Sequence, residues 1–429
     1  MHIKIESCRV CGNKNLETVL HLGDQQLTGV FPSSPQEQVT VGPLELVKCI
    51  ESSDKSCGLL QLRHNFSLTE MYGDNYGYRS GLNSTMVKHL AQKIDYLKKY
   101  IELQEGDLVV DIGSNDATLL SMHDKKAVRI GIDPTAKKFK SFYSSDMIIL
   151  DNFFSASLFE NKFSGQKAKL ITSIAMFYDL EAPLGFASDI AKILHPEGLW
   201  LFEQSYMPRM VEMNAYDTVC HEHLEYYGIR QVEWIVKRAE LKIIDCTFNG
   251  ANGGSFAVLC AHVANKRFDE MSNLKDIVRA ELDAGYNTIK PYQDFEKRVK
   301  DQKIKLQKII RDLKSAGKTV AGYGASTKGN VVLQYCGFSS DEIYFISEVN
   351  KDKYGKFTPG TGIPIISEAE AVKKNPDYYL VLPWHFRDGI IKKEMEYLKN
   401  GGQLIFPMPE IEFVSYDSLQ SSSATKFYD

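Results

Sequence analysis

The stretch Leu108-Val109-Val110-Asp111-Ile112-Gly113-Ser114-Asn115-Asp116 decides how this chain of 429 residues folds. Its apolar run predicts a buried strand, and Gly113 predicts a tight turn after that strand, at which we expect a helix to start. A glycine in this place lets the backbone approach a ligand closely, while Asp111 offers a carboxylate beside it. The pattern is typical of a doubly wound α/β domain, although an ordinary glycine turn in another α/β protein can share it.

A second apolar run follows at the spacing that such a domain requires. Residues 128–132 end in Asp133, about 20 positions beyond the glycine, where these folds hydrogen-bond the hydroxyls of an adenosine ribose. The turn carries one glycine and several acids, so a pyrophosphate would meet negative charge there. S-adenosylmethionine has a cationic amino group and sulfonium, and it is the adenosyl ligand that this turn favours.

Alternating strands and helical segments extend this domain from Asp107 to about Val263. We predict its strands at 108–112, 128–132, 147–150, 169–174 and 199–203. Ligands in such sheets lie at the carboxyl ends of the strands, so the cofactor-binding candidates are Asp111, Gly113, Asn115, Asp133, Asp151, Asn152, Phe153 and Ser173. Asp151 and Phe153 are the candidates for the adenine side, and a core role for Phe153 or Phe154 is the alternative.

Half of the eight cysteines lie in the first 57 residues. Cys8-Arg9-Val10-Cys11-Gly12 forms a knuckle, and Cys49 with Cys57 can complete a tetrahedral site for structural zinc. Seven residues separate the second pair, which is more than a compact ribbon has, so His21, His64 or four free thiols remain alternatives. Four thiolates would leave no position for a substrate, and we therefore expect an architectural module.

Composition limits the partners of the chain. The net charge of −4 and the pI near 6.2 provide no global basic field, which makes nucleic acid a poor partner. We find no signal-peptide pattern and no apolar segment long enough to cross a bilayer, and we therefore expect a cytoplasmic protein without membrane contact. We expect a monomer or a weak homodimer.

Residues 216–227 hold the densest group of titratable side chains, around Cys220-His221-Glu222-His223. Two histidines flanking a glutamate suit a general base with an orienting partner, because imidazole titrates near neutral pH. Metal binding is the alternative. The histidines are two positions apart, so on a helix they would diverge, and no third ligand is evident nearby.

A tyrosine-rich stretch, Tyr72-Gly73-Asp74-Asn75-Tyr76-Gly77-Tyr78-Arg79, precedes a helix that we predict from about Asn83 to Tyr100. Rigid aromatic rings with a polar tip can pack between domains or line the mouth of a ligand site. Both interpretations of Tyr76 and Tyr78 remain open on the sequence.

The last third contains a second turn of the nucleotide-binding type. An amphipathic helix with Ile304, Leu306, Ile309, Ile310 and Leu313 as its apolar stripe is followed by a strand and then by Gly322-Tyr323-Gly324-Ala325-Ser326-Thr327-Lys328-Gly329-Asn330. Hydroxyls and a lysine at a helix N-terminus are a natural seat for phosphate oxygens. This second crevice has the positive charge that the first one lacks. We predict that strands at 343–347 and 378–382, together with His385, form the rest of it.

The predicted fold class is α/β, with two doubly wound Rossmann-like domains preceded by a small zinc-binding, β-rich module. We predict the zinc module at 1–70, a methyltransferase domain at 71–265, a helical connector at 266–316 and the second Rossmann-like domain at 317–429.

These motifs resemble those of the sugar C-methyltransferases that act on nucleotide-linked keto-deoxyhexoses. The resemblance covers nearly the whole chain, through the Cys8–Gly12 knuckle, Tyr76–Ser80, Asp111–Asp116, Met176–Leu180, Glu203–Pro208 and Tyr216–Tyr227. It implies a zinc module, a central S-adenosylmethionine domain and a C-terminal domain that helps to hold the nucleotide sugar. It further implies that His223 is the base, that Glu222 is its polar neighbour and that Tyr76 or Tyr78 closes over the substrate.

The chain departs from that family at two places. Cys220 stands where some members have tyrosine, and Met176 to Tyr178 stands where some have a histidine after the fourth strand. Tyr178 can take over a hydrogen bond there.

The resemblance implies a mechanism in which His223 removes a proton from a carbon beside a ketone, and the enolate then attacks the sulfonium methyl group. Candidate donors to the enolate oxygen are His221, Tyr178 and Tyr76. The candidate substrate-binding residues are Tyr78, Arg79, Ser326, Thr327, Lys328, Asn330 and His385. Alternatives are an O- or N-methyltransferase of another metabolite, and a non-catalytic zinc-ribbon scaffold or RNA-binding protein.

Overall fold

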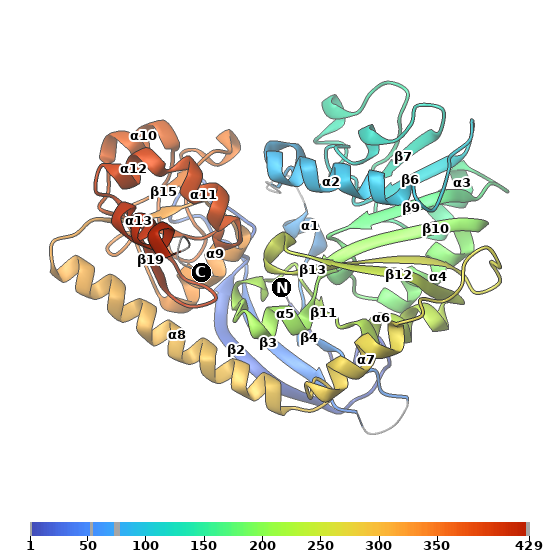
Figure 1. Cartoon of the computed structure of the whole chain (residues 1–429), viewed down its shortest axis with the longest axis horizontal. Coiled ribbons are helices and arrows are strands. Elements are labelled where there is room, and N and C mark those ends of the chain that lie inside the picture. Colours follow the sequence, from blue (N-terminus) through green and yellow to red (C-terminus); the bar gives the residue numbers. More distant parts are fainter. Residues whose placement is uncertain (1, 52–54, 73–77, 426–429) are drawn as a thin grey trace.

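The computed structural model describes residues 2–51, 55–72 and 78–425, and it has two α/β lobes with a small β-rich module between them (Figure 1). The lobe on the right of Figure 1 contains residues 84–262, and the lobe on the left contains the C-terminal third. The strands of the N-terminal module run beneath the space between the two lobes. This arrangement confirms the predicted fold class.

The first lobe is built on a seven-stranded sheet with the order β12-β13-β10-β9-β6-β7-β8. All neighbours are parallel except β13, which is antiparallel to both β10 and β12. The five predicted strands are present; they are mostly apolar, and all but the half-buried edge strand near residue 149 are largely buried. The strands are β6 (Leu108–Ile112), β7 (Val128–Ile132), β8 (Ile148–Leu150), β9 (Ala168–Ile174), β10 (Leu194–Ser205), β12 (Leu241–Asn249) and β13 (Ser255–His262).

The helices of this lobe have the apolar faces that the sequence predicts. Helix α2 (Ser84–Leu97) begins at Asn83, whose side chain accepts hydrogen bonds from two backbone amides of the first turn. Leu90, Ile94 and Leu97 on one face of α2 are buried. The other helices of the lobe are α3 (Ala156–Lys162), α4 (Pro183–Ile193), α5 (Met207–Glu212) and α6 (Ile229–Arg238).

The predicted helix start after Gly113 is wrong. Asn115 and Ala117 have φ angles of 50° and 58°, and L-residues with such values cannot continue a right-handed helix. The chain instead forms an irregular loop that ends in the short 3₁₀ helix η2 (Leu120–Met122). The loop after β6 therefore presents side chains and backbone carbonyls rather than a helix N-terminus.

The second lobe is a six-stranded sheet with the order β16-β15-β14-β17-β18-β19. Its first strand, β14 (Val320–Tyr323), lies between β15 and β17 and leads through Gly324 into helix α9 (Thr327–Cys336). Here the strand, turn and helix follow one another as predicted. The remaining strands are β15 (Ile346–Glu348), β16 (Ile365–Ser367), β17 (Tyr378–Val381), β18 (Gln403–Phe406) and β19 (Glu412–Val414), and the helices are α10 (Glu368–Lys374), α11 (Arg387–Lys393), α12 (Met395–Lys399) and α13 (Tyr416–Thr425).

The N-terminal module is a four-stranded sheet that recruits a strand from the first lobe. Strands β2 (Leu16–Gln26), β3 (Val41–Cys49) and β4 (Leu60–Leu62) pair in antiparallel fashion. The two-residue strand β11 (Glu225–Tyr226) pairs with β4 and completes the sheet. Because β11 begins two residues after His223, the module is joined directly to the histidine-rich segment.

Two helices connect the lobes, α7 (Leu274–Asp283) and the long α8 (Lys290–Ser315). Helix α8 packs against β2 and α9 and runs below both the module and the second lobe (Figure 1). Leu306 and Ile310 of the predicted stripe are buried, but Ile304 is 64% exposed, so its place in the stripe was wrong. The buried face is continued by Gln302 and Val299 instead.

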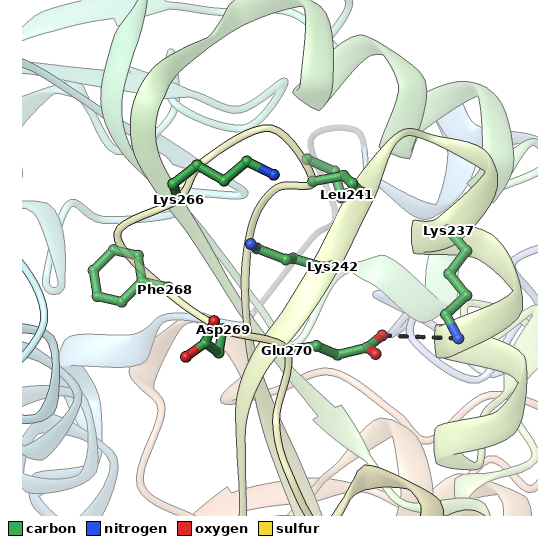
Figure 2. Close-up of a pocket in the computed structure, with 8 residues that line it drawn as sticks. Lys237, Leu241, Lys242, Lys266, Phe268, Asp269 and Glu270 are labelled. Carbon is green, nitrogen blue, oxygen red and sulfur yellow. Dashed lines mark ion pairs between the residues drawn. The ribbon is translucent and has the colours of Figure 1, made fainter.

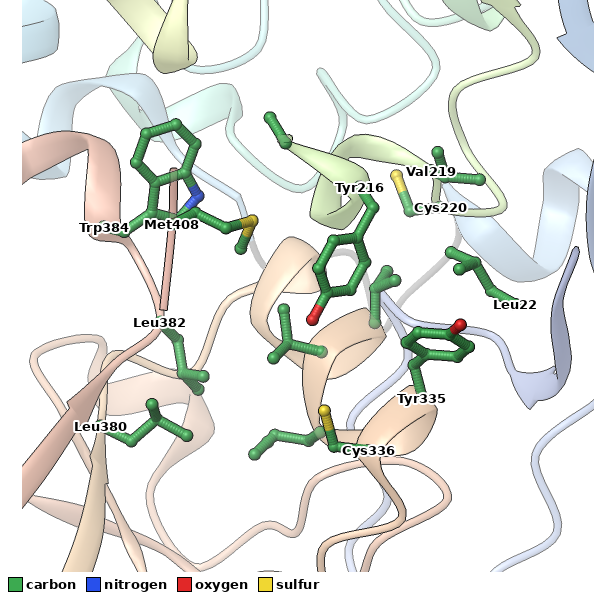
Figure 3. Packing of buried hydrophobic residues seen from close by; sticks show 14 of the residues in the cluster. Leu22, Tyr216, Val219, Cys220, Tyr335, Cys336, Leu380, Leu382, Trp384 and Met408 are labelled. Carbon is green, nitrogen blue, oxygen red and sulfur yellow. The ribbon is translucent and has the colours of Figure 1, made fainter. Parts of the chain in front are cut away.

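One hydrophobic core joins all three parts of the molecule (Figure 3). It contains Leu22 of β2, Tyr216 and Cys220 of the first lobe, and Tyr335, Leu382 and Trp384 of the second. Each of these side chains is less than 10% exposed. The histidine-rich segment 216–223 is thus anchored by apolar packing at the junction.

Within the three described ranges of the chain, no helix has the length and apolarity needed to cross a membrane.

Candidate active site

His223 lies at the junction with one ring nitrogen already bonded. Its Nδ1 is 2.9 Å from the carbonyl oxygen of Thr218, and since a carbonyl oxygen only accepts, Nδ1 carries the proton. Nε2 is therefore left as the acceptor, which is the form that a general base needs. Burial and the charge of Lys328 lower the pKa of His223 to about 3, so the imidazole is neutral at physiological pH.

The ring of Tyr178 packs on the ring of His223, with centroids 4.3 Å apart and planes inclined by 59°. Tyr178 belongs to the short 3₁₀ helix η4 (Phe177–Asp179) after β9, at the carboxyl edge of the sheet. Its backbone carbonyl accepts a hydrogen bond from the amide of Leu224, which holds the two segments together. The structure thus brings Tyr178 and His223 together, as we expected.

His221 occupies a different environment from His223. It is fully buried, its Nε2 is 3.4 Å from the carbonyl oxygen of Gly42, and its Nδ1 is 3.4 Å from the amide of Thr28. The rings of His221 and Phe66 form a T-shaped pair, with their centroids 4.6 Å apart. Since both nitrogens face protein groups, we assign His221 to the packing of the N-terminal module and not to the set of enolate donors.

Glu222 points to the place where all three parts of the chain meet. Its Oε2 accepts a hydrogen bond from Oγ1 of Thr28 at 3.4 Å, and its Oε1 lies next to Gly29. Burial raises the pKa of its carboxyl group. The residue Glu222 as a whole is half-buried.

The carboxylates expected to bind S-adenosylmethionine are grouped at the carboxyl ends of β6 and β7. Oδ1 of Asp111 accepts from Thr172 at 2.6 Å, and burial together with the charge of Asp133 raises the pKa of Asp111 to about 7. Asp133 accepts from the amides of Asn115 and Thr135 at 2.8 and 2.6 Å. Each carboxylate retains lone pairs for a ligand, and a cation would relieve the cost of burying Asp111.

This crevice fits the adenosyl group in two further respects. Gly113 has a φ of 75°, which favours glycine, and a Cβ there would lie 3.1 Å from the side chain of Met176. Phe153, after β8, is 44% exposed, which leaves its ring available for a purine to cover. Asp151 and Asn152 beside it are exposed as well.

Ser173 does not face the crevice. Side chains alternate along a strand, and Thr172 points toward Asp111, so Ser173 points to the other face of the sheet. There it is fully buried and accepts a hydrogen bond from the indole of Trp200 at 2.9 Å. We therefore assign Ser173 to the core and Thr172 to the support of the crevice.

Residues 78–81 close one side of the crevice. The carbonyl oxygen of Tyr78 accepts from the side-chain amide of Asn115 at 3.2 Å, and Arg79 forms an ion pair with Asp116 at 3.3 Å. Arg79 also lies over the ring of Phe142, 4.3 Å from its centroid. Tyr78 is 49% exposed at this edge, and Tyr76 lies outside the described residues.

The second turn places a positive charge opposite His223. Lys328 is in the first turn of α9, and its Nζ donates to the carbonyl oxygen of Asn252 in the first lobe at 3.4 Å. Its charge lowers the pKa of both His223 and His385, after burial as the main cause. Lys328 therefore lies between the lobes, within electrostatic range of the candidate base.

The other predicted substrate residues have varied surroundings. Ser326 caps α9 by accepting from the amide of Gly329, while Thr327 lies close to Gly29 and Glu222. Burial lowers the pKa of His385 to about 3, and its Nδ1 is buried without a partner among the described residues. Asn330, in contrast, is fully buried and donates to the carbonyl oxygen of Thr28 at 2.7 Å, so we assign it to the junction.

The four N-terminal cysteines converge as predicted. Their Sγ atoms all lie within 4.8 Å of one another, and the closest pairs are Cys8 with Cys57 at 3.5 Å and Cys11 with Cys49 at 3.6 Å. These distances exclude disulfides and suit four thiolates around one tetrahedral ion. His21 and His64 are not part of the cluster.

Three family models match successive parts of the chain. They are described as "Putative zinc binding domain" over residues 8–72, "Methyltransferase domain" over 82–245 and "C-methyltransferase C-terminal domain" over 250–409. The chain is also 29% identical over 418 residues to the C-methyltransferase NovU of Streptomyces niveus, covering 96% of this chain and 98% of that protein.

Together these matches support an S-adenosylmethionine-dependent C-methyltransferase.

Solved structures align with smaller parts of this C-methyltransferase. A methyltransferase from Clostridium acetobutylicum is 11% identical, covers 42% of this chain and 92% of its own, and has a TM-score of 0.32. Magnesium protoporphyrin IX methyltransferase from Synechocystis is 13% identical, covers 45% and 91%, and has a TM-score of 0.33.

Similarity to C-methyltransferases favours carbon as the methyl acceptor over the O- and N-methylation alternatives. It also supersedes the scaffold and RNA-binding alternative. The four-cysteine cluster is the structural zinc site of the C-methyltransferase, and S-adenosylmethionine is its cofactor.

A surface cavity of about 380 Å³ in the C-methyltransferase is not part of this site (Figure 2). Lys237, Lys242, Lys266 and Phe268 line it, near the start of β12 and the end of β13. Because β13 is antiparallel to β10, that end lies at the amino edge of the parallel strands. The carboxylates of the cofactor crevice are at the opposite edge.

Sequence reasoning missed two contacts near His223. The indole of Trp384 donates to Oδ2 of Asp217 at 2.9 Å, which ties the second lobe to the segment that carries the Thr218 carbonyl. Thr28 of the N-terminal module is fully buried against His221 and Glu222. A single tryptophan or threonine in a loop carries no motif, so the sequence alone has no signal for either contact.

Proposed function

We propose that this C-methyltransferase methylates a carbon next to a ketone in a nucleotide-diphosphate-linked deoxysugar, with His223 as the base. The observation that supports this most directly is the position of Lys328, whose charge acts on His223 from the second lobe. An anionic diphosphate held by Lys328 would place its sugar in the space between that turn and the imidazole. The resemblance to sugar C-methyltransferases points to the same substrate class.

The protonation state of His223 suits this role. Nδ1 donates to the Thr218 carbonyl oxygen, so Nε2 is free to take a proton from carbon. The low pKa of His223 arises from burial and then from Lys328. A bound diphosphate would neutralise Lys328 and raise the pKa of His223, which makes the imidazole a stronger base only when substrate is present.

The methyl donor would be held by the loop after β6, by Asp111, Asp133 and the ring of Phe153. S-adenosylmethionine supplies an electrophilic methyl group on a sulfonium when it is bound. The protein must also stabilise negative charge on the ketone oxygen while carbon is deprotonated. Tyr178 is our candidate donor among the described residues, because its ring lies against His223.

Exchange of a carbon-bound proton with deuterium from solvent tests the base without methyl transfer. We expect the enzyme to exchange the proton next to the ketone in a panel of nucleoside-diphosphate-linked 4-keto-6-deoxyhexoses, with no methyl donor present. His223→Ala should lower exchange and methyl transfer by about 1,000-fold, within the range for general base catalysis. Its affinity for S-adenosylmethionine should stay within about twofold of the unaltered enzyme, because His223 is outside the crevice of Asp111.

Half-buried His195, near the amino end of β10, supplies the control, since His195→Ala leaves the junction untouched and should exchange normally. Normal exchange by His223→Ala would eliminate it as the base. Methyl transfer to a sugar without any exchange in the unaltered enzyme would favour O-methylation and contradict the carbon-acid mechanism.

A further inference from the structure

A tight turn of the zinc module lies at the junction of the two lobes. Strand β2 ends at Gln26, and the amide of Val30 then donates to the carbonyl oxygen of Leu27 at 3.2 Å. Thr28 and Gly29 are the central residues of that turn. Leu27 and Val30 are buried on either side, so the turn is fixed at both ends.

Thr28 contacts both of the other parts of the chain. Its Oγ1 lies 3.4 Å from Oε2 of Glu222 and also 3.4 Å from Nδ1 of His221. Its amide faces the same His221 nitrogen, and its carbonyl oxygen accepts from Asn330 of α9 at 2.7 Å. Thr28 itself has no exposed surface. All the polar groups of this one residue are therefore directed at the junction.

Gly29 constrains Glu222 more tightly than Thr28 does. An ideal Cβ at Gly29 would lie 2.1 Å from Oε1 of Glu222, where no real atom can stay, and 3.4 Å from Oγ1 of Thr327. Gly29 does not have a left-handed φ, so its backbone does not require glycine. The space that the missing side chain leaves is the space that the Glu222 carboxylate fills.

Helix α9 holds the turn from the other side. One helical turn beyond Asn330, the side-chain amide of Gln334 accepts from the amide of Gln26 at 2.8 Å and donates to its carbonyl oxygen at 3.1 Å. The same helix carries Lys328 in its first turn. Helix α9 thus fixes the distance between the end of β2 and Lys328.

We propose that Thr28 and Gly29 are positioning residues of the active site, which hold the Glu222 carboxylate beside His223. The inference rests on the proposed function, with His223 as the base, and on the resemblance to sugar C-methyltransferases, which implies that Glu222 is the polar neighbour of that base. It gives the zinc module a part in catalysis. Thr28 fixes the position of the Glu222 carboxylate through a hydrogen bond from its hydroxyl, and Gly29 leaves the space that the carboxylate occupies. A displacement of about 1 Å in such a group can cost about 100-fold in rate.

Two substitutions separate the two contacts. Gly29→Ala inserts a methyl group against Oε1 of Glu222, and we expect deuterium exchange on the keto-sugar panel to fall by about 100-fold. Thr28→Val keeps the shape and backbone bonds of Thr28 but removes the hydroxyl, and a loss of about tenfold corresponds to one ordinary hydrogen bond. Thr28→Ser restores the hydroxyl and should recover exchange to within about threefold of the unaltered enzyme.

Matched controls are available in the same chain. Gly389→Ala adds a methyl group where no atom lies within 4 Å. Thr18→Val removes a threonine–glutamate hydrogen bond, Thr18 to Glu45 at 2.6 Å, on the exposed side of the same module. Both controls should retain exchange, zinc content and melting temperature, and all variants should keep their affinity for S-adenosylmethionine.

A double-mutant cycle with Glu222→Gln distinguishes positioning from a general loss of packing. If Thr28 and Gly29 act through Glu222, Gly29→Ala and Thr28→Val should cause little further loss of exchange in the Glu222→Gln enzyme. Losses that add fully to that of Glu222→Gln would overturn the proposal, as would normal exchange by both single variants.

A crystal structure of Gly29→Ala provides a readout that needs no substrate. A displaced Glu222 carboxylate supports the proposal, and an unmoved carboxylate refutes it. If the unaltered enzyme exchanges no proton on any keto-sugar of the panel, the proposed function fails, and the positioning inference is then decided by this structure alone.

Discussion

The two glycine turns after β6 and β14 start from equivalent central strands, but they continue differently. After β6, Asn115 and Ala117 adopt positive φ angles and the chain forms an irregular loop that carries Asp116, close to Asp111 near the end of β6. After β14, Ser326 caps a regular helix that carries Lys328. Both strands lie where the direction of the sheet topology reverses, the usual ligand position in such folds.

This difference shows how one architecture can sort two ligands by charge. A helix N-terminus attracts anions through its free amides and dipole, so it suits a diphosphate and would repel a sulfonium. A loop of carboxylates does the reverse. The comparison predicts that damage to one turn affects one ligand, whereas damage to the module between the lobes affects both.

Removal of zinc should have the largest effect and should disturb both turns together. Structural zinc sites contribute about 10–16 kcal/mol in small peptides, which matches the total stability of an ordinary domain, about 5–15 kcal/mol. Chelation should therefore unfold the module, release β11 from β4 and abolish methyl transfer. Titration of both ligands by calorimetry, before and after zinc is restored, checks this. Full binding of both ligands by the zinc-free protein would show that the turns are independent of the module.

Reversal of the charge at Lys328 should affect only the second turn. We expect Lys328→Glu to weaken binding of a nucleoside diphosphate by about 100-fold, as measured calorimetrically, because a desolvated charge pair becomes a repulsive one. Binding of S-adenosylmethionine should change by less than about twofold. Lys351→Glu, at an exposed lysine of the same lobe, is the control. Equal losses for both ligands would contradict the assignment of Lys328 to one of them.

The smallest expected effect is the pH dependence of S-adenosylmethionine binding beside the first turn. Burial raises the pKa of Asp111 to about 7, so the free enzyme holds a proton there at lower pH. A cationic ligand prefers the ionised carboxylate, so affinity for S-adenosylmethionine should rise about tenfold per unit as pH increases toward 7 and then level off. Asp111→Asn should bind more weakly and lose this dependence. A flat profile for the unaltered enzyme would exclude Asp111 as the group that meets the cation.

The sequence predicted the strands better than the segments between them. Runs such as 108–112 and 128–132 are mostly apolar because both faces of the sheet are covered, and their limits agree with β6 and β7. The helix after Gly113 was wrong because positive φ at Asn115 and Ala117 depends on tertiary hydrogen bonds, including the bond of the Asn115 amide to Asp133. No local pattern carries that information.

The site residues that cluster in the sequence could be predicted, whereas contacts between the lobes could not. The segment around His223 and the four cysteines have spacings that mark them in the sequence. The prediction for Ser173 considered only its position at the end of a strand and not which face of the sheet its side chain points to. Thr172 is the residue that faces Asp111. Thr28 and Trp384 act across more than 160 residues of chain, and no spacing rule connects them to Glu222 or Asp217.

Strand β11 has a consequence for synthesis of the chain on the ribosome. Strand β4 ends at Leu62, but its partner β11 begins only at Glu225. At roughly 5–20 residues per second, that edge of the sheet stays open for roughly 10–30 s while the first lobe is made. A nascent protein in this state exposes an unpaired strand edge, which is a hazard for aggregation and a natural point for chaperones to act.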